Sequence, residues 1–377
     1  MIIMRLKLLV IDDTDLSSFD KGQQYRTYNT YFSLSKYLEI NFLLQKLSNP
    51  SKLRWANFYV VNDFSRTNSL LYTDYISLFN LNLFNNIMKI IKNINPDLII
   101  LEHIYGINRP SLLASKFLGE KIIYNSHGEE IEVCKNSRCK SLIYPVEYSF
   151  YKLSDYIFSI SYEDAIKACY YYNLPISKFK ILPMGIRKIR CNKLNKDLIR
   201  NNENSKIIAV FHGNLDYEPN LIAFQKILNI SKYFQDIKFI ILGNSLKIKP
   251  FKSENVEYLG YVEDIDHYLC LSDFAIAPLV EGTGVKTKIL DYISARLPII
   301  TTRKGIEGIN VKDLGNYPIF VYDEVNKDFL TGIQYIMKNI ETLKEKAIRA
   351  NIKLPTWDDV PILMLKYIYE IINVKGE

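Results

Sequence analysis

Short runs of Ile, Leu and Val alternate with helix-length amphipathic stretches along most of this chain. Continuous apolar runs predict strands buried on both faces, and the helical stretches between them predict parallel connections. A second series of the same kind begins at residue 206. The pattern therefore predicts an α/β protein with two doubly wound parallel sheets. The strands predicted in the first series are 6–11, 58–61, 97–101, 121–124 and 156–160.

The alternation stops once, in the middle of the chain. Residues 188–205 are basic and polar, and they have almost no periodic apolar spacing, which predicts a linker. We therefore expect one domain over 1–187 and a second over 206–353. The first predicted strand does not lead into a G-x-G-x-x-G turn, which disfavours a nicotinamide or flavin Rossmann enzyme.

Length and charge narrow the class of protein. A chain of 377 residues suits two domains of ordinary size. The formal net charge of +7 favours anionic partners such as sugar nucleotides or phospholipid head groups, although a mildly basic protein without such a partner is equally compatible. No long Lys/Arg run indicates sequence-specific DNA binding, so we expect no nucleic-acid partner.

The cysteines and the apolar segments bear on localisation. The five cysteines are odd in number and form no C-x-x-C pair, so neither a disulfide framework nor a zinc site is indicated, although Cys134 and Cys139 could form a bridge. A reducing, intracellular compartment is the simpler expectation. The apolar N-terminus is short and resembles a buried strand more than a signal peptide, and no run of 18 apolar residues follows. We therefore expect a cytoplasmic protein.

The segment EGTGVKTKILDY, residues 281–292, carries the clearest candidate chemistry. Gly282 and Gly284 flank Thr283 and allow close approach of a ligand to the backbone, and the helix predicted to begin here offers unpaired N–H groups for phosphate. Lys286 and Lys288 fall near the start of that helix, where the macrodipole disfavours cations by about 0.3–1 kcal/mol each. A bound diphosphate would compensate for both lysines.

Helical spacing adds a carboxylate to this segment. Gly284, Lys288 and Asp291 fall at i, i+4 and i+7 and are predicted to share one helix face. A carboxylate one turn beyond Lys288 could accept hydrogen bonds from two hydroxyls of a ribose. The alternative is a Lys288–Asp291 surface ion pair on an ordinary amphipathic helix, and the segment alone leaves both open.

Residues 278–309 resemble the GT-B glycosyltransferases, in particular the group 1 retaining enzymes, family 4 of the usual classification. The block has that family's Gly-rich loop, basic pair, acidic residue, proline-started strand and G-x-E-G turn. The segments FHGNLDYEPN, INPDLIILEH, KIIYNSHGEE and LPMGI are similar to other parts of the pattern. The resemblance implies a GT-B fold, with two Rossmann-like domains facing a central cleft. It also implies that the helix in 354–377 crosses back to the N-terminal, acceptor-binding domain.

The resemblance also implies roles for individual residues. Lys286 and Lys288 would neutralise the donor diphosphate, together with backbone amides of 282–284. Asp291 would hold the ribose, Val262 would line the base pocket, and His127 would lie near the transferred sugar. The remaining residues of the implied donor site are Gly22, Gly213, Asn214, Glu281, Gly282, Thr283, Gly284 and Glu307, with Arg26 as a further candidate.

Some of these residues have simpler interpretations. An isolated histidine such as His127 is more often structural than catalytic, and Glu307 could merely cap a turn. Many family members carry two glutamates eight residues apart, where this chain has Thr283 and Asp291, so Glu281 would have to replace the first. Many also have Arg and Lys in the loop that follows Gly213, where this chain has neither.

The function implied is transfer of a hexose from a nucleoside diphosphate sugar to a hydroxyl of a glycan or lipid-linked acceptor, with retention of configuration. No cofactor or metal is expected, because lysines and helix ends would neutralise the diphosphate. One alternative is an inactive GT-B-like protein that binds a nucleotide sugar and partners another transferase, and another is a sugar-nucleotide epimerase. Residues 140–152 mix basic and aromatic side chains, which suits either peripheral contact with the inner face of a membrane or an ordinary core helix.

Overall fold

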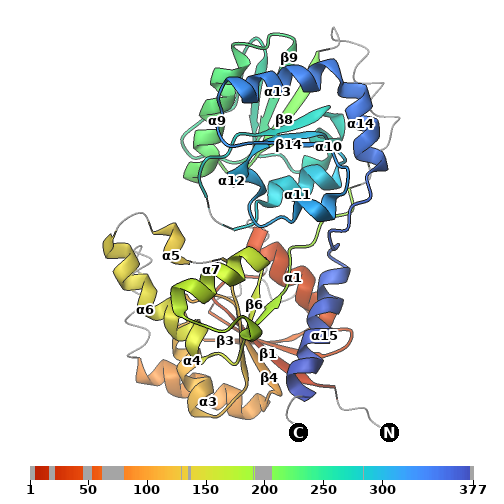
Figure 1. Cartoon of the computed structure of the whole chain (residues 1–377). Coiled ribbons are helices and arrows are strands. Elements are labelled where there is room, and N and C mark those ends of the chain that lie inside the picture. The colour runs from red at the N-terminus through yellow and green to blue at the C-terminus, as the bar shows by residue number, and fades with distance from the viewer. Residues whose placement is uncertain are drawn as a thin grey trace. The chain divides into compact units, whose positions relative to one another are not determined.

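The computed structural model describes residues 5–16, 22–45, 53–61, 80–128, 130–134, 137–189, 191, 206–282 and 284–373. The chain divides into two units (Figure 1): unit 1 combines Met1–Met184 with Trp357–Glu377, and unit 2 is Gly185–Thr356. Most of the predicted linker, 188–205, lies outside the described residues.

Unit 1 is built on a sheet of seven strands in the order β3-β2-β1-β4-β5-β6-β7, and every neighbouring pair is parallel. The strands are β1 (Lys7–Asp12), β2 (Glu39–Leu44), β3 (Asn57–Val60), β4 (Leu98–Leu101), β5 (Ile122–Asn125), β6 (Tyr156–Ser159) and β7 (Phe179–Ile181). The helices are α1 (Gly22–Leu34), α3 (Leu81–Ile94), α4 (Asn108–Phe117), α5 (Glu130–Val133), α6 (Ser137–Leu153), α7 (Tyr162–Tyr172), the 3-10 turn η2 (Ile176–Lys178) and α15 (Asp359–Asn373).

Alternate residues of the central strands supply two separate cores, because successive side chains of a strand point to opposite faces. Leu9 and Ile11 of β1 pack with buried residues of α3, α4, α6 and α7, and Leu8 and Val10 pack with those of α1 and α15. Helix α15 therefore completes the core of unit 1 from the other end of the sequence (Figure 1).

Unit 2 contains a second sheet, in the order β10-β11-β9-β8-β12-β13-β14, in which the short β10 is antiparallel to β11 and the other pairs are parallel. The strands are β8 (Ile207–His212), β9 (Ile237–Leu242), β10 (Phe251–Lys252), β11 (Val256–Gly260), β12 (Phe274–Ala277), β13 (Ile299–Thr302) and β14 (Ile319–Tyr322). The helices are α9 (Glu218–Ser231), α10 (Ile265–Leu271), α11 (Thr287–Ser294), α12 (Arg303–Ile306), the 3-10 turn η3 (Val311–Leu314), α13 (Lys327–Lys338) and α14 (Ile340–Arg349). The α/β class with two largely parallel sheets is as predicted.

The cysteines contradict the expectation from their spacing. Disulfides join Cys134 to Cys139 and Cys191 to Cys270, which are 79 residues apart in the sequence, and Cys169 is free. The prediction that no disulfide framework exists is wrong, because the fold brings distant cysteines together. Since disulfides persist mainly in oxidising environments, the cysteines no longer support a reducing compartment. None of the described helices is both long and apolar enough to span a membrane.

A thiol count tests these disulfides directly. We expect the unfolded, unreduced protein to take up one alkylating group, at Cys169, and the reduced protein to take up five. Intact-mass and peptide mass spectrometry measure both numbers. Alkylation of Cys191 or Cys270 without reductant would contradict the second disulfide.

Candidate functional site

Unit 2 contains a cavity of about 260 Å³ beside the carboxyl ends of its central strands. The loop after β8 forms one wall, and the segment from β12 to the start of α11 forms the other. Carboxyl ends of parallel strands are where α/β sheets bind ligands. Among the residues that line the cavity are Gly213, Asn214, Asn220, Glu281, Gly282, Lys286 and Lys288.

The loop after β8 can pass close to α11 because Gly213 has no side chain. A Cβ atom on Gly213 would lie 2.8 Å from Asn220 Nδ2 and 2.9 Å from Lys288 Nζ. Asn220 Nδ2 also donates to the carbonyl of Asn214 at 2.8 Å, which fixes the loop against α9. The backbone of Gly213 and the ammonium of Lys288 therefore meet at one point of the cavity.

Lys288 is held at this point by contacts from the opposite wall. It is buried in the first turn of α11, its Nζ donates to Asn220 Oδ1, and it lies 4.5 Å from the ring centroid of Phe211. Burial, with the charge of Lys286, lowers the pKa of Lys288 to about 7. An anion in the cavity would reverse part of this effect.

Lys286 is the N-cap residue of α11, and Gly284 lies before the helix. The prediction that Gly284 shares a helix face with Lys288 is therefore wrong, because the helix begins three residues later than the pattern suggested. Gly284 instead contributes its carbonyl, which accepts a hydrogen bond from Lys286 Nζ. Gly282 has φ +103°, a conformation that favours glycine. Thr283 lies outside the described residues.

Glu307 lies near the same end of α11. Its Oε2 is 3.6 Å from Lys286 Nζ and 2.7 Å from Lys304 Nζ, and its side chain is mostly buried. Glu307 follows α12 as the C-cap residue. The residue therefore contacts the basic pair, and this position is compatible with both interpretations drawn from the sequence.

Asp291 lies one turn beyond Lys288, outside the residues that line the cavity. Its Oδ1 accepts a hydrogen bond from Arg187 Nε at 2.8 Å, and its Oδ2 is 3.5 Å from His212 Nε2. Burial raises the pKa of Asp291, and Arg187 opposes that effect. Because Lys288 bonds to Asn220, the alternative of a Lys288–Asp291 surface ion pair is not what the structure shows. Val262 follows β11, two residues before the N-cap of α10, and is partly buried.

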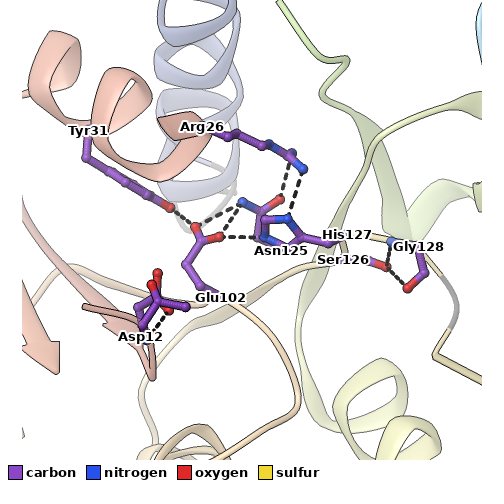
Figure 2. A network of polar contacts seen from close by, with 9 residues as sticks. Asp12, Arg26, Tyr31, Glu102, Asn125, Ser126, His127 and Gly128 are labelled. Atoms are coloured by element: carbon purple, nitrogen blue, oxygen red, sulfur yellow. Dashed lines mark hydrogen bonds and ion pairs between the residues drawn. The ribbon is translucent and has the colours of Figure 1, made fainter. Parts of the chain in front are cut away.

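In unit 1, polar side chains meet at the carboxyl ends of β4 and β5 (Figure 2). The carboxylate of Glu102 is buried and accepts hydrogen bonds from the hydroxyl of Tyr31, from Asn125 Nδ2 at 2.9 Å and from His127 Nε2 at 2.8 Å. Arg26 of α1 donates to His127 Nδ1 at 3.2 Å. The side chain of His127 therefore has a partner at each ring nitrogen.

Burial keeps the side chain of His127 neutral. Burial lowers its pKa well below the usual value, and Arg26 lowers it further, so the imidazole is neutral at pH 7. The neighbouring His103 has φ +113°, and its ring centroid is 4.0 Å from that of His127. Strained backbone of this kind clusters at functional sites. Gly22, also predicted in the site, is the first residue of α1 in this unit, and Arg26 is buried.

Several members of these two clusters are not among the residues predicted from the sequence. Glu102, His103 and Asn125 each lie at or just after the end of an apolar strand, which was the available signal. Asn220 and Arg187 gave no such signal, because their partners lie 68 and 104 residues away in the sequence.

Replacement of Glu102 tests the network of unit 1. In Glu102→Gln one carboxylate oxygen becomes an NH₂ group that faces donors, either Tyr31 and Asn125 at the Oε1 position or Asn125 and His127 at the Oε2 position. We expect a loss of about 2–4 kcal/mol in the free energy of unfolding, as for a broken buried charged network. Chemical denaturation measures this loss, and the exposed Glu163→Gln serves as a control with an expected change below about 0.5 kcal/mol. Equal stability of the two variants would contradict the network.

Comparisons with known proteins agree with the fold. Residues 206–344 match the family model described as glycosyl transferases group 1. The structure is similar to that of a glycosyltransferase from Rickettsia africae ESF-5, with 14% identity, a TM-score of 0.68, and 99% of this chain and 100% of that chain covered. A search of curated protein sequences gives no match.

Two further structures are similar over nearly their whole length. Sucrose-phosphate synthase from Thermosynechococcus elongatus has 12% identity and a TM-score of 0.73, with 98% of this chain and 100% of that chain covered. Anabaena HepE in complex with UDP and glucose has 11% identity and a TM-score of 0.71, with 97% and 99% covered. The chain therefore has the GT-B fold, and the match to the group 1 glycosyl transferase model covers residues 206–344. The predicted fold class is confirmed.

Proposed function

We propose that the protein transfers a hexose from a nucleoside diphosphate sugar to a hydroxyl acceptor, with retention at the anomeric carbon. The observation that carries this proposal is the cavity of unit 2, where Lys288 meets the backbone of Gly213 and Lys286 lies beside Gly282. Burial destabilises the charged form of a lysine, and a neighbouring anion offsets that cost. A bound diphosphate supplies such an anion.

Each residue of the candidate site has a proposed role. Lys286 and Lys288 neutralise the charge that develops on the departing diphosphate, which is the main source of rate enhancement in this mechanism. Glu281 lines the same cavity and replaces the missing first glutamate as a partner for a sugar hydroxyl. Asp291 holds the ribose. His127 orients the transferred sugar with a neutral ring.

Metal-independent catalysis is part of the proposal, because the two lysines provide the positive charge. The acceptor is proposed to be a glycan or a lipid-linked sugar. Tyr144 and Tyr148 of α6 are exposed, which supports peripheral contact with a membrane.

A panel of UDP-, GDP-, ADP- and dTDP-sugars tests the proposal. A ligand that binds only the folded state raises the unfolding temperature more the tighter it binds. We expect the sugar nucleotides of one base to raise the unfolding temperature. We also expect the sugar of that donor to be transferred, or slowly hydrolysed, in the presence of EDTA. A protein that binds a nucleotide sugar without turnover would instead be the inactive partner protein, and binding of none would contradict the proposal.

A sugar-nucleotide epimerase is a second candidate, favoured by two of the similar structures. One is named as a putative UDP-N-acetylglucosamine 2-epimerase from Listeria monocytogenes, with 12% identity and a TM-score of 0.61. Product analysis separates the two activities. A transferase releases the nucleoside diphosphate, whereas an epimerase changes the configuration of one sugar carbon.

The pKa of Lys288 predicts how donor binding depends on pH. The diphosphate prefers the ammonium form, which is present below a pKa of about 7 and is lost as pH rises through it. We therefore expect the dissociation constant of the nucleoside diphosphate to rise by about tenfold from pH 6.5 to 8.5, with proton uptake on binding. Isothermal titration calorimetry in two buffers of different ionisation enthalpy measures both. Affinity independent of pH over this range would contradict the assignment.

A further inference from the structure

Arg187 joins two helices of unit 2 through its guanidinium group. Its Nε lies 2.8 Å from Asp291 Oδ1 on α11, and its Nη2 lies 2.9 Å from Asp266 Oδ1 on α10. The side chain is about three-quarters buried, at 26% exposure. An arginine between two carboxylates fixes the orientation of both, because the planar group donates in set directions.

The backbone around Arg187 is attached to unit 2 at three other places. The amide of Ile186 donates to the carbonyl of Pro355 at 2.8 Å, and Ser294 Oγ donates to the carbonyl of Arg187. The disulfide between Cys191 and Cys270 ties the same segment to α10. The guanidinium group is therefore held in place by contacts that do not depend on a bound donor.

Asp291 needs such a partner. Burial raises its pKa, the charge of Asp266 raises it further, and Arg187 is the group that lowers it. His212, 3.5 Å from Oδ2, has a pKa lowered by burial and by Lys288 and Arg187, and so adds no charge at pH 7. A carboxylate has about four acceptor positions, and Arg187 Nε uses one. The ionised group can still accept from two neighbouring hydroxyls.

We propose that Arg187 is the positioning residue of the ribose site, which keeps Asp291 oriented to accept the ribose hydroxyls and so selects ribonucleotide over 2′-deoxyribonucleotide donors. This inference rests on the proposed function, since Asp291 holds a ribose only if a nucleotide binds. Arg187, which precedes the predicted linker, would then belong to the ribose site and help to select the sugar of the nucleotide.

The test compares UDP, GDP and ADP, each with its 2′-deoxy form, by isothermal titration calorimetry. For the base that binds, we expect the wild-type protein to prefer the ribose form by about 10- to 100-fold, as for a hydrogen bond to a charged group. Arg187→Ala should reduce this preference to within about threefold, and Arg187→Lys should retain part of it. Asp291→Asn should abolish the preference in the same way.

The pH profile separates a positioning role from a purely structural one. Without Arg187 the pKa of Asp291 rises, so the preference for ribose should be lost at a higher pH as the solution is acidified. A structural defect would weaken both nucleotides equally and leave their ratio unchanged, which overturns the inference. If Arg187→Ala does not fold by circular dichroism, Asp266→Asn removes only the second anchor and should lower the ratio by about threefold.

The outcomes distinguish this inference from the proposed function. Wild-type protein that binds none of the nucleotides contradicts the proposed function itself. Wild-type binding with equal affinity for both forms overturns the role of Asp291 and Arg187 but leaves a diphosphate site. If the wild-type protein prefers the ribose form, and Arg187→Ala or Asp266→Asn has the same ratio of affinities for the two forms, only the role of Arg187 is overturned.

Discussion

Lys288→Ala is expected to lower kcat/KM for sugar transfer by about 10²- to 10³-fold, the effect of removing one preorganised group that stabilises developing charge. The ammonium group lies in the cavity beside Gly213 and is positioned by Asn220 before any ligand binds. No rearrangement is then needed when charge develops on the diphosphate. Initial rates with the donor identified by the panel measure the loss, and calorimetry with the nucleoside diphosphate measures the binding component.

Two controls make the result specific. Lys338→Ala removes an exposed lysine in the last turn of α13 and should leave both measurements within about twofold of wild type. Among the described residues Lys288 contacts Asn220 and Phe211 and no carboxylate, so its removal should not destabilise the fold, and denaturation checks this. Turnover retained in Lys288→Ala would refute the assignment of the cavity as the diphosphate site.

Much of the fold could be predicted because strands and helices depend on local patterns. The apolar run at 6–11 became β1, Lys7–Asp12, and buried alternate side chains in two cores. Helix α11 begins at Thr287, later than the helical spacing of Gly284 and Lys288 predicted, because Lys286 adopts an extended conformation as the N-cap. Gly284, which was predicted in the helix, therefore lies in the loop before it.

The candidate site could be predicted only in part, because several of its contacts join residues that are far apart in the sequence. The positions of Lys286 and Lys288 followed from one short segment. Their partners did not: Asn220 lies opposite Lys288, and this contact spans 68 residues.

Gly243→Ala is the second substitution with a large expected effect, in this case on stability. Gly243 follows β9 with φ +133°, and a Cβ atom there would lie 2.0 Å from the carbonyl oxygen of Gly213 and 2.6 Å from its carbonyl carbon. Both atoms belong to backbone, which cannot rotate away as a side chain can. The amide of Gly243 also donates to the carbonyl of Gly260 at 2.8 Å, so the strand end is held on both sides.

The cost of this substitution has two parts. A non-glycine residue in this backbone region costs about 1–3 kcal/mol, and overpacking adds about 1–3 kcal/mol. For a unit of this size we expect an unfolding temperature lower by on the order of 10 °C. Because relief of the clash must displace Gly213, which lines the cavity, the variant should also lose the thermal stabilisation by nucleotide.

Gly119→Ala is the matched control for Gly243→Ala. Gly119 has φ +75°, but no atom lies within 4 Å of the added Cβ, so that variant pays only the backbone cost of about 1 kcal/mol. It should keep full stabilisation by nucleotide. If Gly243→Ala unfolds at the same temperature as Gly119→Ala and still responds to nucleotide, the close approach of the two strand ends is refuted. A large loss in Gly243→Ala alone would show that this approach shapes the floor of the donor site.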